Sequence, residues 1–381
     1  MAGTNEDVFG IPLDVALRVI DMVASNRATL KTCCLVNRAF SAYAQSLLFR
    51  SVKLEAYRSF ASYSQAVASS TERGRALGQL ARELLFICDK YMDYEHLALR
   101  DIFKILPYLR NLVHLELHLR GCDFTPDQLG ILSRTTSITS LHLHNFTKFG
   151  QTNVHDILAS LPQITKLRLD GSAFHIVPGR EPLKLMLSEL HWHIDLDPSA
   201  QELKWLLGES SDLCALSIVS PHENISRSLP DRLLPLLLEH YGRNLHTLRL
   251  SDRIDSLDFV QSSCPILSEL SLRFWPAPSV LATLPRRLNH LALARPDKTT
   301  ANESALRELM SSLGNLPHLQ TITWLTRDGV SLNERTEFRR FCDTRGIRII
   351  EPPPCKYVPC IPRFAPRGLP EFTRIRLPRY I

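Results

Sequence analysis

Apolar residues recur at helical spacing near the start of the chain. Positions three and four apart share one helix face, and the stripe that starts at Leu13 contains Leu13, Ala16, Leu17, Ile20, Val23 and Ala24. A second apolar stripe beside it contains Val15, Val19 and Met22. A surface helix needs an apolar stripe of roughly 100°, and this helix carries one about twice as wide. The width predicts two packing surfaces, one for the segment's own core and one for a partner or for the rest of the chain.

Two further helices are expected before residue 50. Ser25 or Asn26 can cap the second helix, and Asn37 can cap the third. The third helix has the spacing of a buried face at Phe40, Tyr43, Ala44, Leu47 and Leu48. Three short helices enclose only a small core, so we expect this unit to lean on something larger.

Beyond residue 80 the apolar pattern changes to a repeated phrase, Leu-x-x-Leu-x-Leu. The middle apolar positions of its clear copies are Leu115, Leu141, Leu167, Leu190, Leu216, Leu248, Leu270, Leu291 and Ile322. Adjacent copies lie about 21 to 32 residues apart, and a leucine-rich repeat takes about 20–29 residues. Helical stretches fill the intervals. Several of them end in Leu-Pro or Cys-Pro, where the proline ends the helix and an extended segment follows.

The expected fold class is therefore α/β, with a small N-terminal three-helix unit followed by an irregular leucine-rich-repeat solenoid. Each repeat supplies one strand and one helix, so that parallel strands line the concave face and helices the convex face. Stacked repeats bury a continuous core that no single repeat can bury alone. The expected divisions are an N-terminal extension at 1–10, the helical unit at 11–50, a linker or helical connector at 51–80, the repeats at 81–350 and a Pro-rich basic tail at 351–381.

Alternation along each strand predicts which side chains face the concave surface. The residues that we expect to bind a target are His114, Glu116, His142, His144, Lys166, Arg168, His191, His193, Arg249 and Arg273. Histidine would make this surface more positive below about pH 6.5. Lys166 and Arg168 form the best candidate pair for an acidic or phosphorylated segment, since a guanidinium pairs with carboxylate and phosphate. A protein contact without phosphate and a merely solvated face both remain open.

Composition and motifs narrow the chemistry. The 381 residues carry a net charge of +6, and the nine cysteines show no disulfide framework, which favours reduced thiols in the cytoplasm or nucleus. Much of the positive charge lies in the tail, so the nearly balanced body argues against nucleic-acid binding. We find no membrane-length apolar run, phosphate-binding loop or nucleophile elbow. The concave histidines do not converge as zinc ligands do. We therefore expect no membrane segment, enzyme activity, cofactor or metal.

Residues 11–50 carry three short motifs in a fixed order. They read Ile-Pro-Leu-Asp at 11–14, Leu-Val-Asn-Arg-Ala-Phe at 35–40 and Leu-Phe at 48–49. In order and spacing they resemble the F-box family, whose usual forms are Leu-Pro-x-Glu, Leu-Val-Cys-Arg-x-Trp and Leu-Trp. Asn37 stands where cysteine is usual, and Phe40 and Phe49 stand where tryptophan is usual. The sequence of this segment resembles the F-box-like families expanded in basidiomycete fungi. An F-box followed by leucine-rich repeats is itself a known family architecture.

The resemblance implies the substrate-recognition subunit of an SCF-type (cullin–RING) ubiquitin ligase. Such a subunit binds a Skp-type adaptor, and through it a cullin, and holds a target protein whose identity the sequence does not give. The residues expected to contact the adaptor are Ile11, Pro12, Leu13, Val15, Val19, Ile20, Val36, Phe40, Leu48 and Phe49. The alternative is a non-catalytic leucine-rich-repeat scaffold, in which the helical unit is only an N-terminal cap and has no ubiquitin connection.

Overall fold

The computed structural model describes twelve stretches of the chain. They are residues 12–69, 71–89, 97–120, 122–145, 153–171, 182–194, 199–208, 210–219, 233–251, 257–294, 303–325 and 332–351. The chain divides into two compact units: unit 1 runs up to His118, and unit 2 begins at Leu119. Twelve strands form one sheet in which the spatial order, β1 to β12, is the order along the chain. The α/β fold class with parallel strands is thereby confirmed.

Unit 1 begins with the three helices expected from the apolar pattern. They are α1 (Leu13–Met22), α2 (Arg27–Cys33) and α3 (Arg38–Arg50). Asn26 Oδ1 accepts hydrogen bonds from the amides of the first turn of α2, and Asn37 Oδ1 accepts one from the amide of Phe40 at 2.9 Å. The small core of these helices consists of Ile20, Leu30 and Ala44, against which Leu17, Cys33, Cys34, Phe40, Tyr43, Leu47 and Leu48 pack.

The rest of unit 1 begins the sheet. It contains β1 (Ser51–Leu54), α4 (Tyr57–Val67), α5 (Glu72–Leu80), β2 (Glu83–Asp89), α6 (Leu99–Ile105), the 3-10 turn η2 (Leu106–Tyr108) and most of β3 (His114–Arg120). Strand β1 pairs in parallel with β2 and buries Val52 and Leu54. The sheet therefore starts inside the stretch 51–80, for which the sequence pattern predicted only a linker or helical connector. The residues of β1, Ser-Val-Lys-Leu, do not match the Leu-x-x-Leu-x-Leu motif, so the repeat pattern did not predict this strand.

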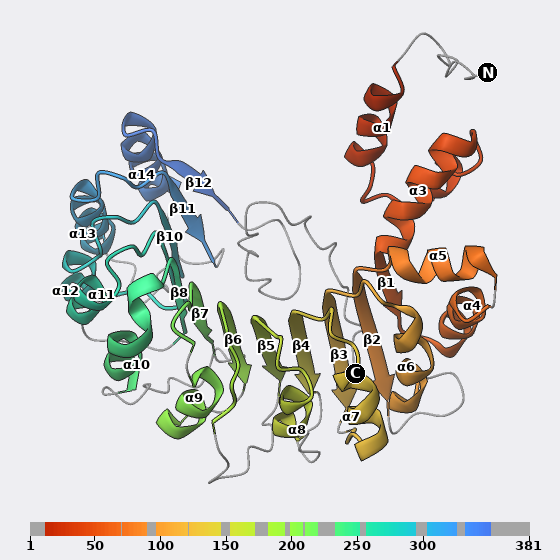
Figure 1. Ribbon diagram of the computed structural model, residues 1–381. Coiled ribbons are helices and arrows are strands. Elements are labelled where there is room, and N and C mark those ends of the chain that lie inside the picture. The colour runs from red at the N-terminus through yellow and green to blue at the C-terminus, as the bar shows by residue number, and fades with distance from the viewer. Residues whose placement is uncertain are drawn as a thin grey trace, which may run out of the picture. The chain divides into compact units, whose positions relative to one another are not determined.

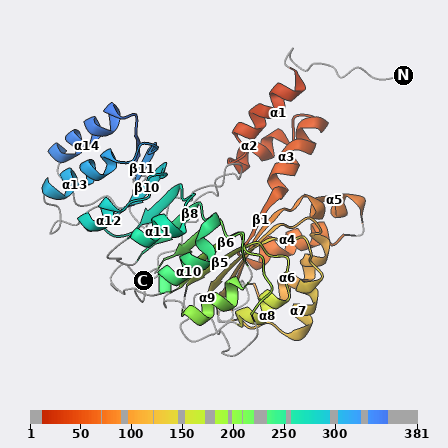
Figure 2. The ribbon, with the colours of Figure 1, turned by 60° about the vertical axis from the view of Figure 1, so that its left-hand side comes forward.

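Unit 2 continues as alternating helices and strands. Its strands are β4 (Ser140–Asn145), β5 (Lys166–Gly171), β6 (Glu189–Ile194), β7 (Ala215–Ile218), β8 (Thr247–Leu250), β9 (Glu269–Leu272), β10 (His290–Leu293), β11 (Thr321–Trp324) and β12 (Arg348–Ile350). Its helices are α7 (Pro126–Ser133), α8 (Val154–Ala159), α9 (Ala200–Leu207), α10 (Leu233–Tyr241), α11 (Asp258–Ser263), α12 (Pro278–Ala282), α13 (Glu303–Gly314) and α14 (Leu332–Thr344), with the 3-10 turn η3 (Gly242–Asn244). Figures 1 and 2 show these helices on one side of the strands of unit 2, and the other side of these strands is the concave face.

The repeated leucines explain this stacking. In the parallel register Leu141 lies beside Leu167, Leu167 beside Leu190, and the same row continues through the middle apolar position of each strand to Ile322 in β11. Every member of the row in unit 2 is 1% exposed or less. Each buried leucine contributes roughly 1.5–3 kcal/mol before conformational entropy is subtracted. The row is therefore the continuous core that the repeat pattern predicted, and it holds the opposite face of each strand toward the concave surface.

Candidate interaction surfaces

Helix α1 divides its apolar residues between two surfaces. Leu17 and Ile20 belong to the core of the three helices. Val15, Val19 and Met22 lie on the other stripe and are 45%, 55% and 84% exposed. No described residue covers this second stripe. The wide apolar surface is thus split into a packed half and an open half.

The ten residues predicted to contact an adaptor fall into three groups. Pro12, Val15, Val19 and Val36 are exposed, and Leu35, which the prediction did not include, is also open to solvent. Ile20 is buried, Phe40 and Leu48 pack against its core, and the ring of Phe49 stacks on Tyr63. Ile11 and the side chain of Leu13 lie outside the described part of the chain. The first group is open to a partner, and the second supports the fold of the unit, with Phe40, Leu48 and Phe49 half-buried.

On the concave face of unit 2, strands β4 to β6 carry a network around Asp170. His142 Nε2 lies 2.7 Å from Asp170 Oδ2. Arg168 Nε donates to both carboxylate oxygens, at 3.0 and 2.8 Å, and His193 Nδ1 lies 3.2 Å from Oδ1. One carboxylate thus binds three basic side chains from three adjacent strands. The network follows from the register, which places His144, Asp170 and His193 in one row across the sheet.

A second carboxylate, Glu189, binds the neighbouring basic groups. Lys166 Nζ forms an ion pair with Glu189 Oε1, and His191 Nε2 lies 3.8 Å from Oε2. Burial alone would raise the pKa of Glu189, but His191 and Lys166 outweigh it and lower the pKa to about 2. Burial likewise opposes ionisation of Asp170, but His142, His193 and Arg168 hold its pKa well below its ordinary value. Both carboxylates are therefore charged at neutral pH.

These contacts correct two expectations about the concave face. His142 was expected to be open on the concave surface for a target, but it is only 6% exposed and is bonded to Asp170. Lys166 and Arg168 were expected to be available to an acidic target, but each already pairs with a carboxylate of the same chain. Close parallel strands bring the charged rows together, so the bases are neutralised internally.

The expected rise of histidine charge near pH 6.5 is also wrong for three histidines of this face. Burial lowers the pKa of His193 to about 4 against the opposing effect of Asp170. Burial and the nearby Arg249 lower the pKa of His290 to about 4. Burial likewise lowers the pKa of His191 despite its contact with Glu189. The imidazoles of His193 and His290 are therefore neutral between pH 6 and 7.5.

Asp170, His193 and Ser217 are linked in the order of a hydrolase triad. His193 Nδ1 faces Asp170, and His193 Nε2 lies 2.8 Å from Ser217 Oγ. Ser217 is 1% exposed, however, and lies inside the parallel ladder, where β7 is paired on both sides. Its backbone amides belong to that ladder, which leaves them unable to form an oxyanion hole. The chain of bonds fixes the register of β5, β6 and β7 rather than exposing a nucleophile.

The concave face of β8 to β11 has a different character. Two of its contacts are hydrogen bonds without an ion pair: Thr247 Oγ1 donates to Glu269 at 3.3 Å, and His290 Nε2 lies 2.8 Å from Thr323 Oγ1. Arg249 is buried in this region, and burial lowers its pKa to about 10. Arg273, also predicted to bind a target, is half-buried after the end of β9. The neighbouring positions are small, at Ser271, Ala292 and Ala294.

The remaining predicted target residues lie on β3 and β4. Glu116 and His118 are both buried and form a pair at 2.9 Å, whereas His114 is half-buried. The rings of His142 and His144 stack with centroids 5.9 Å apart. No group of three or more histidine, cysteine, aspartate or glutamate side chains among the described residues is arranged to hold a metal ion. The structure therefore places the predicted histidines in pairs and networks, not at one site.

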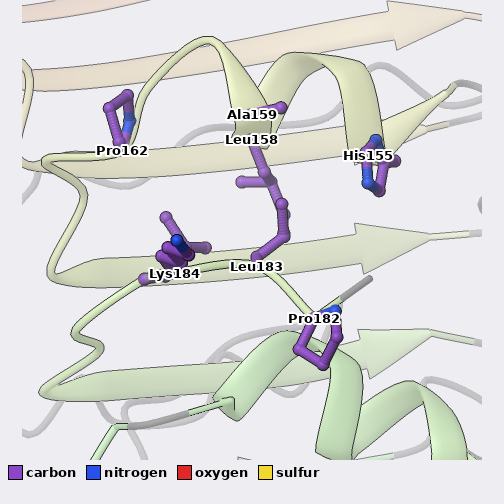
Figure 3. A pocket seen from close by; sticks show the side chains of 8 residues that line it. His155, Leu158, Ala159, Pro162, Pro182, Leu183 and Lys184 are labelled. Atoms are coloured by element: carbon purple, nitrogen blue, oxygen red, sulfur yellow. The ribbon is translucent and has the colours of Figure 1, made fainter. Parts of the chain in front are cut away.

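A shallow hollow lies on the helical side of unit 2. Figure 3 shows its lining, in which Leu158 and Ala159 of α8 and Pro162 face Pro182 and Leu183 from the segment before β6. Its volume is about 290 Å³, at the lower limit of the roughly 300–1,000 Å³ typical of ligand pockets. The hollow is mostly carbon-lined and has no group of converging polar atoms. It lacks the features of a small-molecule site.

Membrane insertion gains no support from the helices. Among those in the described ranges, none combines the length and the apolar character needed to cross a bilayer.

Two solved structures are similar to this chain at low sequence identity. No protein-family model matches the sequence, and no curated protein matches it. Among solved structures, the chain is similar to a protein from Bacteroides fragilis, with 14% sequence identity and a TM-score of 0.39. The match covers 64% of this chain and 66% of the Bacteroides protein, which is just under two thirds of that protein's length. It is also similar to the leucine-rich repeat-containing protein LegL7 from Legionella pneumophila, with 16% identity and a TM-score of 0.40 over 67% and 79% of the two chains. The leucine-rich-repeat architecture rests on this chain's own repeats and strand register.

Proposed function

We propose that this protein is a non-catalytic recognition subunit of an SCF-type ubiquitin ligase. In this proposal residues 11–50 bind a Skp-type adaptor, and through it a cullin, while the repeats bind a target protein. The observation that carries the proposal is the open stripe of α1, in which Val15, Val19 and Met22 are exposed beside a completed core. The F-box-like motifs of the same segment name the partner that would cover this stripe.

Energetics favour a covering partner. Burying apolar surface stabilises a fold or a complex by roughly 25 cal/mol per Å². The exposed aliphatic side chains of this small unit do not yet contribute that free energy, and a partner that covers them would gain it. Leu35 and Val36, in the turn between α2 and α3, add a second exposed apolar position. The adaptor is expected to touch these two regions of the unit. The target would then be held by unit 2, so that the ligase gains effective concentration and orientation rather than a new catalytic group.

The test uses exposed positions, because a change at Ile20 would disrupt the core of the three helices. Val19→Asp places a charge in the proposed interface, where burying it unpaired costs several kcal/mol. Ala42→Asp is the matched control, since Ala42 is exposed on α3 and is not among the predicted contacts. We expect purified Skp-type adaptor to be retained by the wild type and by Ala42→Asp but not by Val19→Asp.

The alternative scaffold function predicts a different result. If the helical unit is only a cap, the wild type will not retain the adaptor at micromolar concentration, and Val19→Asp will change nothing. Circular dichroism of each variant checks that the helices remain folded. Loss of adaptor binding by both aspartate variants would mean that the effect is not specific to the α1 stripe.

A further inference from the structure

A row of exposed basic side chains follows one edge of the sheet in unit 2. Its members are Arg134, Lys184, Arg243, Arg286 and Arg287. Each lies in a segment that leads from a helix, or from the preceding loop, into a strand. No ion pair within the described residues involves any of the five. We call this row the basic edge.

The fold, not the sequence order, brings these residues together. Their segments lead into β4, β6, β8 and β10, and the amino ends of parallel strands meet at one edge of a sheet. Adjacent strands lie about 4.8 Å apart, so basic positions on every second strand are spaced by about 10 Å or more, and the row covers roughly 30 Å. In the described edge segments between β4 and β11 the one acidic residue is Asp212. Among the described residues of these edge segments, basic side chains therefore outnumber acidic ones by five to one.

The concave face offers a contrast. Its bases Lys166 and Arg168 are bonded to Glu189 and Asp170, so an acidic partner would have to displace those carboxylates. At the basic edge the charges already face solvent. An acidic partner would therefore be attracted to the basic edge, whereas the bases of the concave face are already paired with carboxylates of the same chain.

We propose that the basic edge binds an extended acidic segment of a partner protein. An extended chain in the polyproline II conformation has three residues per turn and rises about 3.1 Å per residue, so carboxylates at every third residue lie on one face about 9 Å apart, close to the spacing of the row. The inference deepens the proposed function and rests on one part of it, the capture of a target by unit 2. Exposed ion pairs contribute only about 0.2–1 kcal/mol each, so the contact should be of modest affinity and sensitive to salt.

A protein partner fits this edge better than a nucleic acid. Single-stranded nucleic acids are bound by basic grooves with aromatic side chains on which bases stack. The described edge segments between β4 and β11 contain no phenylalanine, tyrosine or tryptophan. A duplex strand presents one phosphate per roughly 3.4 Å, about three times the charge density that this row can pair.

The experiment measures binding of a fluorescein-labelled 15-residue peptide with glutamate at every third position to the full chain, by fluorescence anisotropy. The edge variant is Arg243→Glu with Arg286→Glu. The control is Lys204→Glu with Arg340→Glu, which changes two exposed bases on α9 and α14 and alters the net charge equally. We expect the edge variant to bind at least tenfold more weakly and the control less than twofold, with wild-type binding weakened as salt is raised.

Three results would overturn the inference. They are no binding of the peptide by the wild type, equal loss in both double variants, and tighter binding of a single-stranded oligonucleotide of the same length. Thermal melts of the variants check folding. Adaptor binding separates this inference from the proposed function. If only the inference about the basic edge is wrong, the wild type still binds the adaptor. If the ligase proposal is wrong, the wild type does not bind the adaptor.

Discussion

The two halves of the concave face in unit 2 share a backbone but not a chemistry. Over β4 to β6 the inward positions hold histidines, bases and carboxylates, which are joined around Asp170 and Glu189. Over β8 to β11, which we call the neutral half, the equivalent positions are mostly serine, threonine and alanine, and His290 is bonded to Thr323. The charged exceptions in this half are Arg249, Glu269 and Arg273. Both halves cover the same row of buried leucines. The difference therefore lies entirely in the side chains that the core does not specify.

The comparison teaches how charged side chains behave on closely spaced strands. Neighbours in one row are only about 4.8 Å apart, so opposite charges on adjacent strands pair before a partner arrives. A dense charged face is then rigid and internally neutral, and its charged residues stabilise the fold. Recognition of charge is left to places where the chain separates its side chains, such as the basic edge.

The largest expected difference concerns the carboxylate at the centre of the charged half. Asp170→Ala removes the partner of His142, Arg168 and His193, and breaking a buried ion pair from one side costs about 3–5 kcal/mol. Glu269→Ala, in the neutral half, removes the acceptor of Thr247 and the carboxylate whose charge opposes the desolvation of the buried Arg249, and should cost about 1–2 kcal/mol. Urea unfolding of both variants measures the free energies. Similar losses would mean that the charged network adds no stability of its own.

The leucine core should not distinguish the two halves. Leu141→Ala under the charged half and Leu291→Ala under the neutral half each remove a fully buried side chain. Each should cost about 2–5 kcal/mol through lost transfer energy and the cavity left behind. The same unfolding experiment applies. A loss below about 1 kcal/mol at either position would show that the core is not continuous under that half.

A smaller difference is expected at the middle inward position of each half. His142→Ala removes a partner of a buried carboxylate and should cost about 1–3 kcal/mol. Ser271→Ala, at the same row of β9, should cost less than about 1 kcal/mol because the small side chain packs without a charge. If His142→Ala is as mild as Ser271→Ala, His142 is solvated and does not support Asp170.

The smallest effect is the dependence of stability on pH. His193 is surrounded by Asp170, Arg168, His191 and Ser217, and its pKa of about 4 lies below the ordinary value of about 6.5. Between these values the unfolded chain binds a proton that the folded chain does not, so stability is complete above pH 6.5 and falls as the pH drops toward 4. Glu189 and Asp170, whose pKa values are lowered, add a further loss as the pH falls below about 4.

Calorimetry between pH 7 and 5 should show a loss of about 1–2 kcal/mol from His193. His193→Gln should remove this part of the loss, because glutamine does not titrate. Unchanged or rising stability of the wild type over that range would contradict the burial of a neutral imidazole. The neutral half offers an internal comparison at His290, where the direction is the same.

Much of the fold could be predicted from the sequence because the leucine phrase fixes strand, face and register together. Asn26 and Asn37 likewise identified two helix starts, since a capping side chain acts within three residues. Strand β1 could not be found this way, because Val52 and Leu54 are too few apolar residues to separate a strand from a helix. Its place depends on pairing with β2, about thirty residues later along the chain.

The candidate surfaces were predicted less well. Alternation correctly assigned the inward side of β4 to β6, but it does not say whether a charged side chain faces water or a neighbour. Asp170 was on the predicted face and yet was not among the expected target residues, because its importance comes from His142 and His193 on other strands. The two stripes of α1 were separable from spacing alone, whereas only the packing of α2 and α3 shows which stripe remains open.

The strands lie in the sheet in the same order as along the chain, and this has a consequence for how the protein can evolve. Each strand after β1 lies beside the strand that precedes it in the chain, so a segment touches mainly its two neighbours. Duplicating or deleting one strand–helix module creates one new junction and leaves all the others as they were. Closing each successive loop costs a similar, modest entropy, since that cost grows only with the logarithm of loop length. A lineage can therefore lengthen or shorten the array module by module, and vary the solvent-facing residues of each, without redesigning a common core.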